Sequence, residues 1–320
     1  MEEFVKIFQN YIAQFEHITI FRHTHPDTDA YGAQYGLKQW LQDNYPEKHI
    51  YALGIENSDK SYFPSSDDIE DAIVSNSLAI AVDCGNLERI DDQRIKLAKK
   101  ILKIDHHPNV EPFGDDNLVD TSCASCTQLL ASIFRAIDEN SVSKTCSAYL
   151  YRGLLTDSLC YKTSSTSAKT LEIGAYLANK GIDIRAINLE LFDIDLKTFK
   201  LKTIVRNKIQ IHNEHIAYCI FDLDDLNKYE LSGKQAREFV NEMGSVKEFA
   251  IWAIFNQRQD DKGNILYDGS LRSKHVPINQ IAAKYHGGGH ANASGIKGLT
   301  QNDLTNLLQD LEDILIEQNV

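Results

Sequence analysis

The fold is decided by HITIFRHTHPDTDAYG, residues 17–32, and by the segments that repeat its pattern. Residues 17–23 form an apolar run that predicts a short strand, and Pro26 ends it because a proline restricts the backbone before it. Residues 30–43 have apolar side chains at helical spacing, and Asp29 is placed to cap that helix. A strand, a polar turn and a helix in this order predict the first half of a βαβ unit.

Four more segments are predicted to be strands of the same sheet. SLAIAVDCG (77–85) is an almost continuous apolar run, typical of a strand buried on both faces, and ILKIDHH (101–107) follows as another strand. HIYALG (49–54) and LVDTS (118–122) are shorter. Strands that alternate with helices predict right-handed βαβ units and a parallel sheet covered by helices. Helical patterns are expected at about residues 2–16, 94–100, 123–139, 144–155, 166–180 and 195–208.

The pattern changes after about residue 190. Residues 209–225 and 247–274 each predict two strands joined by a turn, and HGGGHANASG (286–295) and an amphipathic helix at about 300–317 follow them. The sequence therefore predicts an α/β fold with two domains. A parallel-sheet domain over residues 1–190 is joined by a helical linker over 191–213 to a smaller α+β domain over 214–320.

Polar clusters follow three of the predicted strands at their carboxyl ends, namely HPDTD, VDCGN and IDHH. Ligands of parallel sheets bind beyond this edge, so the three clusters should converge there. Each cluster has an ordinary structural interpretation when taken alone, for example a helix cap at Asp83. Asp157, at the end of an apolar helical stretch, is also a weak signal by itself. Together, so many carboxylates would repel one another and raise each other's pKa unless cations were present.

The clusters therefore predict a metal site. Four aspartates balance the charge of two divalent ions, and two imidazoles complete the coordination. Oxygen-rich ligation with some imidazole favours Mn²⁺, with Mg²⁺ or Co²⁺ as alternatives. Two ions roughly 3.5–4 Å apart are the usual arrangement for hydrolysing phosphate esters. The expected ligands are His23, Asp27, Asp29, Asp83, His106 and Asp157.

The formal net charge of −13 limits the class of partner. Tight binding of long nucleic acid is not expected, because that affinity comes largely from Lys and Arg side chains that neutralise many phosphates. A short anionic substrate, held by metal ions and a few local cations, is compatible with this charge. No signal-peptide pattern and no apolar run of about 18 residues is found, and the six scattered cysteines favour reduced thiols. We expect a cytoplasmic protein without a membrane partner.

Several motifs, in their order and spacing, resemble those of the DHH phosphoesterase superfamily. In the first domain they are FRHTHPDTDAYG, AVDCGN, KIDHHPN and LLTDS. In the second domain, DGSLRSK and HGGGHANASG are similar to the DHHA1 substrate domain. The total length and motif order resemble NrnA-type oligoribonuclease/pAp phosphatases, and the resemblance covers nearly the whole chain.

The resemblance implies a role for each residue of the first domain. One metal ion would be held by His23, Asp27 and Asp83. The other would be held by Asp29, Asp83, His106 and Asp157, so that Asp83 bridges the two. His107 would face the scissile phosphate as a catalytic and substrate-binding residue.

In the second domain, the resemblance implies that Arg272 and His290 hold a substrate phosphate together with the backbone of Gly287, Gly288 and Gly289. Ser273 and Asn292 are further expected contacts. Independently, a glycine run lets backbone N–H groups approach an anion closely, and arginine is a planar two-pronged donor for phosphate. The structural alternatives are a flexible turn for the glycines and a surface ion pair for Arg272.

Two positions depart from the family pattern. Thr28 replaces a frequent glycine between Asp27 and Asp29, and Leu159 stands two residues after Asp157, where a small residue is common. Neither change removes an expected ligand, but both bear on how closely a substrate fits.

The expected activity is in-line hydrolysis by a hydroxide that the metal ions generate from water. Very short RNA (nanoRNA) would yield nucleoside 5′-monophosphates, and the 3′,5′-bisphosphate pAp would yield AMP and phosphate. One alternative is a phosphodiesterase for linear dinucleotides such as pApA, which arise in cyclic dinucleotide signalling. Another is a non-catalytic nucleotide sensor. The sequence leaves these alternatives, the polarity of degradation and the formation of a homodimer open.

Overall fold

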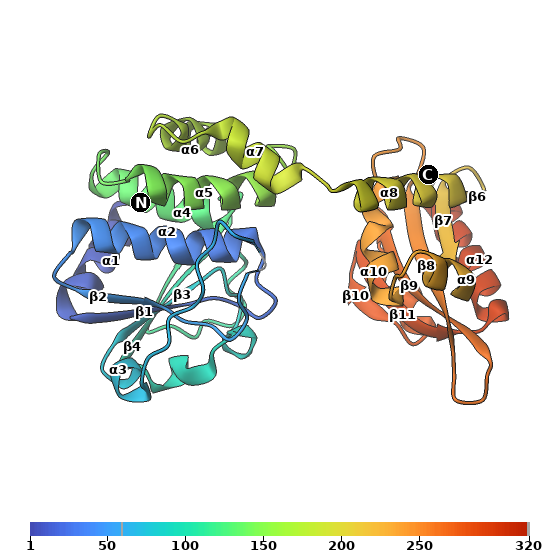
Figure 1. Ribbon diagram of the computed structural model, residues 1–320, viewed down its shortest axis with the longest axis horizontal. Helices are drawn as coiled ribbons and strands as arrows, with labels where there is room; N and C mark the ends of the chain where they lie inside the picture. Colours follow the sequence, from blue (N-terminus) through green and yellow to red (C-terminus); the bar gives the residue numbers. More distant parts are fainter. Residues whose placement is uncertain (59, 319–320) are drawn as a thin grey trace. The chain divides into compact units, whose positions relative to one another are not determined.

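The chain folds into two compact units, Met1–Asp193 and Ile194–Val320, in a computed structural model that describes residues 1–58 and 60–318. Each unit has its own sheet and its own hydrophobic core (Figure 1). Within the described residues, no helix is both long and apolar enough to cross a membrane.

The first unit is built on a parallel sheet of five strands in the order β2-β1-β3-β4-β5. All four strand pairs are parallel, which confirms the sheet predicted from the sequence. Strand β3 is buried along its whole length, as its apolar run predicts. The strands are β1 (His17–Phe21), β2 (His49–Ala52), β3 (Leu78–Val82), β4 (Lys100–Asp105) and β5 (Asp116–Val119).

Helices cover both faces of this sheet. One face packs against α1 (Glu2–Gln14), α2 (Thr28–Asn44), α4 (Cys126–Ile137) and α5 (Lys144–Asp157). Of these, α2, α4 and α5 run above the sheet in Figure 1. The outer helices α6 (Ala168–Ala178) and α7 (Ile184–Phe192) lie over α5. The other face carries α3 (Asp71–Ser75) and the short 3₁₀ helices η1 (Leu87–Arg89) and η2 (Gln93–Leu97).

Two local predictions in this unit need correction. The helix expected at 94–100 is the 3₁₀ helix η2, which ends at Leu97, because Ala98 is extended and Lys100 already pairs in β4. The strand expected at 118–122 is β5, which begins two residues earlier, at Asp116, and ends at Val119.

The second unit contains a mixed sheet of six strands in the order β10-β11-β9-β8-β7-β6. The two predicted hairpins are confirmed, because β6 pairs with β7 and β8 with β9, both antiparallel. Strands β7 and β8 are parallel. The strands are β6 (Gln210–His212), β7 (Ile216–Phe221), β8 (Ile251–Gln259), β9 (Ile265–Ser273), β10 (Gly288–His290) and β11 (Ala293–Leu299).

Two groups of helices cover the two faces of this sheet. On one face lie α8 (Leu196–Lys208), α9 (Leu223–Lys228), α10 (Gly233–Glu238) and the 3₁₀ helix η3 (Phe239–Met243). On the other lie α11 (Asn279–Lys284) and α12 (Gln301–Glu317). Helix α8 falls within the stretch 191–213 and packs on η3 and β7 of the second unit.

Candidate metal centre

The polar clusters that follow β1, β3 and β4 meet at the carboxyl edge of the first sheet. His23 follows β1, Asp83 follows β3, and His106 and His107 follow β4. Asp27 caps α2 by accepting hydrogen bonds from the backbone N–H groups of Asp29 and Ala30. Asp29 lies in the first turn of α2, and Asp157 is the last residue of α5. The structure therefore brings all six expected metal ligands to one place.

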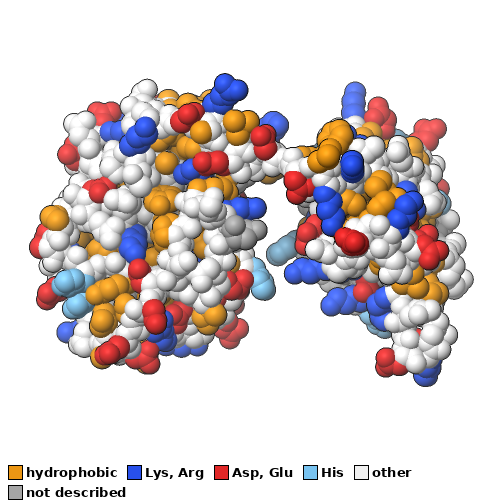
Figure 2. Space-filling model, in the orientation of Figure 1, with side chains coloured by type: hydrophobic (Ala, Val, Ile, Leu, Met, Phe, Trp, Pro, Cys, Tyr) orange, Lys and Arg blue, Asp and Glu red, His pale blue; other side chains and the backbone are white. Residues whose placement is uncertain are grey.

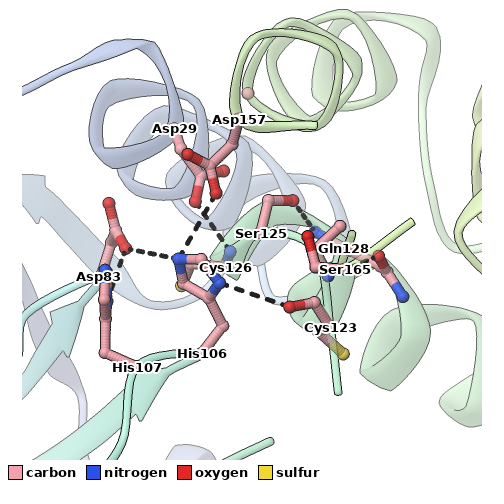
Figure 3. A network of polar contacts seen from close by, with 12 residues as sticks. Asp29, Asp83, His106, His107, Cys123, Ser125, Cys126, Gln128, Asp157 and Ser165 are labelled. Atoms are coloured by element: carbon pink, nitrogen blue, oxygen red, sulfur yellow. Dashed lines mark hydrogen bonds and ion pairs between the residues drawn. The ribbon is translucent and has the colours of Figure 1, made fainter. Parts of the chain in front are cut away.

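Three overlapping groups of side chains are arranged so that one ion could be held by each. Within each group, the candidate ligand atoms lie within 4.8 Å of one another. Figure 3 shows Asp29 and Asp157 pointing toward His106, and the carboxylates of Asp83 and Asp157 both approach Nε2 of that ring. The groups are His23, Asp27 and Asp83; Asp29, His106 and Asp157; and Asp83, His106 and His107.

Asp83 occupies the middle of this cluster and is almost fully buried, with 3% of its side chain exposed. Its backbone has a φ of +54°, a left-handed conformation that is uncommon outside glycine and asparagine. Its Oδ1 atom has no hydrogen-bond partner among the described residues. The nearest nitrogen atoms, on His23, His106 and His107, lie 3.4–3.5 Å from the carboxylate oxygens.

These distances fit a divalent cation better than direct hydrogen bonds. Hydrogen bonds between nitrogen and oxygen are usually about 2.7–3.2 Å long, whereas two ligands of one ion stand slightly farther apart. A buried carboxylate oxygen without a donor would be costly unless something positive faced it. Carboxylates and imidazoles, without a thiolate, are also the ligands that Mn²⁺ and similar ions prefer.

The pKa shifts within the cluster indicate more negative than positive charge. Burial, together with the carboxylates of Asp83 and Asp157, raises the pKa of Asp29 well above its usual value. Burial and Asp83 also raise the pKa of Asp157 to about 6, although His106 opposes the change. Burial lowers the pKa of His106, but Asp83, Asp29 and Asp157 outweigh this effect and raise it to about 10. Bound cations would relieve the same repulsion.

Asp29 is fixed by the start of α4. One carboxylate oxygen accepts a hydrogen bond from Cys126 N at 2.7 Å, and the other accepts from Thr127 N at 3.1 Å and Thr127 Oγ1 at 2.6 Å. A helix N-terminus stabilises a negative charge, so these donors favour the ionised carboxylate and oppose the effect of burial. The sequence did not reveal this contact.

His107 is oriented by Asp105, a residue that the sequence-based ligand set did not include. Asp105 Oδ1 accepts from His107 Nδ1 at 2.9 Å and from the backbone N–H of His106 at 2.8 Å. Because an ionised carboxylate only accepts, His107 Nδ1 carries the proton and Nε2 is left for another partner. The His107 side chain is half-exposed, so that partner can come from solvent or substrate.

Lys103 is the buried basic residue that faces Asp105, the carboxylate that orients His107. Its side chain and that of Asp105 are both fully buried, and Lys103 Nζ lies 3.3 Å from Asp105 Oδ2. Lys103 also donates to the carbonyl oxygen of Gly85 at 3.0 Å and to Asn109 Oδ1 at 3.2 Å. A lysine inside an apolar strand was the available sequence signal for this ion pair, because buried charges are almost always paired.

Arg22, beside His23, holds the neighbouring loop to the same edge. Its guanidinium is fully buried, donates to Gln34 Oε1 and to the carbonyl oxygens of Leu53 and Glu56, and lies 3.6 Å from Asp91. The residue therefore joins β1, α2 and the segment after β2 at the position from which His23 enters the site.

Comparisons with known proteins agree with this geometry. The profile of the DHH family, N-terminal domain, matches residues 17–154, and that of the DHHA1 domain matches residues 213–317. The bifunctional oligoribonuclease and PAP phosphatase NrnA of Bacillus subtilis is 31% identical over 308 residues, which cover 96% of this chain and 97% of that protein. This chain belongs to the DHH family.

Two further comparisons give a second kind of relative and a solved structure with a similar fold. A probable manganese-dependent inorganic pyrophosphatase of Streptococcus thermophilus is 27% identical over 210 residues, covering 58% of this chain and 67% of that protein. The crystal structure of an exopolyphosphatase-related protein from Bacteroides fragilis has the same fold, with a TM-score of 0.82 at 22% identity and 98% coverage of both chains.

In the DHHA1 domain, Arg272 and His290 lie on one face of the sheet. Arg272 pairs with Ala293 of β11, which in turn pairs with His290 of β10, and directly opposed residues of neighbouring strands share a face. Within the described residues, no carboxylate pairs with Arg272, whose Nη1 donates to the carbonyl oxygen of Leu271. Burial lowers the pKa of the Arg272 guanidinium.

Ser273 and Asn292 are engaged with each other and with the backbone. Ser273 is buried and donates to the carbonyl oxygen of Val276, while Asn292 Nδ2 donates to Ser273 Oγ at 2.9 Å. The pair fixes the turn between β10 and β11. Gly289, before that turn, has a φ of +141°, and a Cβ there would meet the carbonyl oxygen of Ala293 at 2.5 Å.

Leu159 stands in a strained position of the DHH domain. It has a φ of +48° and is followed by Cys160 and Tyr161, which also have positive φ values. We expect Leu159→Gly to raise the free energy of unfolding by about 0.5–1 kcal/mol, because relief of the left-handed backbone outweighs the greater flexibility of glycine in the unfolded chain. The Leu159 side chain is 63% exposed, so little burial is lost.

Urea denaturation in a Trp252→Phe background measures this effect, because Trp40 of the DHH domain is then the only tryptophan. Leu171→Gly is the matched control, since Leu171 is also exposed but lies inside helix α6. That variant should lose about 1 kcal/mol. Equal destabilisation by both substitutions would contradict the interpretation of Leu159.

Proposed function

We propose that this chain hydrolyses very short oligoribonucleotides to nucleoside 5′-monophosphates, and pAp to AMP and phosphate. The observation that supports this most strongly is the convergence of His23, Asp27 and Asp83 with Asp29, His106 and Asp157 at one sheet edge. The relative from Bacillus subtilis, which carries both activities in its name, aligns along nearly the whole chain.

The proposed cofactor is a pair of divalent ions, most simply Mn²⁺. Bound ions would lower the pKa of a coordinated water and stabilise negative charge on a phosphoryl group. The proposed ligands of one ion are His23, Asp27 and Asp83, and those of the other are Asp29, Asp83, His106 and Asp157. The unpartnered Oδ1 atom of Asp83 supports its proposed bridging role.

The protein's own residues would then orient the substrate and move protons. His107, with its Nδ1 proton committed to Asp105, would offer Nε2 to a phosphoryl oxygen or to the leaving group. Arg272, His290 and the backbone of Gly287, Gly288 and Gly289 would bind a substrate phosphate in the DHHA1 domain. Ser273 and Asn292 would act as positioning residues that hold the turn next to His290.

The charge of the protein supports short substrates. Acidic side chains are spread over the visible face of both units (Figure 2), and the formal net charge is −13. A long polymer would be repelled along most of its length, whereas a few nucleotides need to satisfy only the metal centre and a small number of cations.

We further propose the cytoplasm as the site of action and residues 191–213 as a linker between domains over 1–190 and 214–320. Its helix is α8, and strand β6 within it already pairs in the second sheet. All six cysteines are free and five of them are buried, which suits a reducing compartment. The formation of a homodimer is a separate proposal that sedimentation of the purified chain would test.

One panel of substrates tests the activity. The purified chain with Mn²⁺ should release AMP from pAp and pApA, and nucleotides from a trinucleotide, but should act poorly on long RNA and on pyrophosphate. Nucleotide binding without turnover would instead establish a sensor, and preference for pyrophosphate would contradict the proposal. Comparing pAp, pApA and the trinucleotide decides the preferred substrate.

A further inference from the structure

On one face of the DHHA1 sheet, α10 and η3 reach as far as β9, and the described helices leave glycines of β10 and β11 exposed. Ser270 and Arg272 of β9 lie opposite Gly295 and Ala293 of β11, and Gly295 lies opposite Gly288 of β10. The same side of the neighbouring strand β8 is buried beneath α8, α10 and η3. Gly288 and Gly295, by contrast, are exposed. We call the side of β9, β10 and β11 that carries these glycines the glycine face.

A cavity of about 370 Å³ lies on the glycine face. This size is at the lower end of the range for small-ligand sites, which begins at about 300 Å³. Its floor is bare backbone: a Cβ built on Gly288 would meet nothing within 4 Å, and one on Gly295 would meet only the carbonyl oxygen of Gly269 at 3.8 Å. Three basic side chains line the cavity, Arg237, His286 and Lys297, and no carboxylate of the described residues does.

Arg237 is held in place at the rim of this cavity. Its side chain is 18% exposed, donates to Asn256 Oδ1 and lies 4.0 Å from Asp268 Oδ2. Asp268 is already paired with Arg258 at 3.2 Å, so one carboxylate faces two guanidinium groups. With exposed Lys297 added, this rim carries an excess of positive charge in a chain whose formal net charge is −13.

The glycine face therefore has basic side chains at both ends. Arg272 and His290 lie at one end, next to Ala293, and Lys297 is four residues farther along β11. At a rise of about 3.4 Å per residue this is roughly 14 Å of strand. That length is too great for one phosphate group and leaves room for a nucleoside between two of them.

We propose that Arg237 and Lys297 bind the terminal 5′-phosphate of a short nucleotide substrate, while Arg272 and His290 hold its other phosphate. The inference rests on the proposed function and deepens it, because it explains how one site would accept both pAp and 5′-phosphorylated dinucleotides. Both kinds of molecule carry two phosphate groups, whereas a dinucleotide with a free 5′-hydroxyl carries one.

The test compares pApA with ApA, which lacks only the 5′-phosphate. In the Arg237→Gln, Lys297→Ala double variant, the KM for pApA should rise about 30- to 100-fold, as expected for loss of two charge-assisted contacts. The KM for ApA should change less than about 3-fold. The Arg237→Gln variant should fold because glutamine can keep the hydrogen bond to Asn256. The single variant Lys297→Ala should fold because the Lys297 side chain is exposed.

Lys234→Ala is the matched control, because it removes a positive charge from the exposed side of the same helix, α10. Its KM values should equal those of the parent protein. An equal rise for pApA and ApA, or no rise for either, would overturn the inference. If the parent protein hydrolyses neither dinucleotide, the proposed activity fails, and equilibrium binding of pApA and ApA to the same variants then decides the anion site separately.

Discussion

Asp83→Asn should abolish hydrolysis, with kcat/KM for pApA falling by roughly 10³-fold or more. Asp83 belongs to two of the three candidate ligand groups, so the change weakens both proposed metal positions at once. Asparagine nevertheless accepts the left-handed backbone at this position and carries no charge. Burial disfavours the charge of Asp83, but His106 and His23 outweigh this effect and lower the pKa of Asp83. The change removes this attraction as well as the repulsion with Asp29 and Asp157, so the metal-free variant should be somewhat less stable than the parent protein.

Three measurements test this prediction. Release of AMP reports the activity, isothermal titration with Mn²⁺ reports the metal affinity, and thermal unfolding with and without metal reports the stability. Asp138→Asn is the control for the loss of one carboxylate, since Asp138 follows α4 away from the cluster. A variant that keeps its activity, or one whose affinity for Mn²⁺ equals that of the parent, would argue against Asp83 as a shared ligand.

Lys103→Met should lower the free energy of unfolding of the first unit by about 3–5 kcal/mol, since removing one partner of a buried ion pair leaves the other uncompensated. Asp105 would keep its contacts with His106 and His107 through Oδ1, but Oδ2 would face no cation. Urea denaturation followed by the fluorescence of Trp40, in the Trp252→Phe background, reports on this unit alone.

Two comparisons isolate the buried charge as the cause. Lys99→Met, at an exposed position just before β4, should change stability by less than about 0.5 kcal/mol. Combining Lys103→Met with Asp105→Asn should recover part of the loss, because the second change neutralises the stranded carboxylate. If the double variant lost more unfolding free energy than the two single variants lose together, the two residues would not act as an ion pair.

The gathering of the metal-site residues could be anticipated from the sequence because topology leaves little choice. HPDTD, VDCGN and IDHH follow strands β1, β3 and β4, and parallel strands bring their carboxyl ends to one edge. The hairpins of the second unit were also predictable, and in the second of them DDKGN (residues 260–264) is the turn-forming segment between β8 and β9.

Contacts between residues far apart in the sequence could not be predicted from local sequence patterns. The donors that fix Asp29 come from Cys126 and Thr127, which are 97 and 98 positions away. The left-handed backbone of Asp83 could not be read from the sequence either, because aspartate adopts this conformation only occasionally. Arg237 and Lys297 belong to no motif and reach the glycine face only through the packing of α10 and the register of β11.

The division of the chain near residue 193 has an evolutionary consequence. Among the described residues, the candidate metal ligands all lie before this point, and the candidate phosphate-binding residues of the second sheet lie after it. Substitutions after residue 193 could therefore change which nucleotides bind and leave the affinity for metal ions unchanged. Closely related genes should therefore diverge in selectivity first and lose their reaction chemistry last.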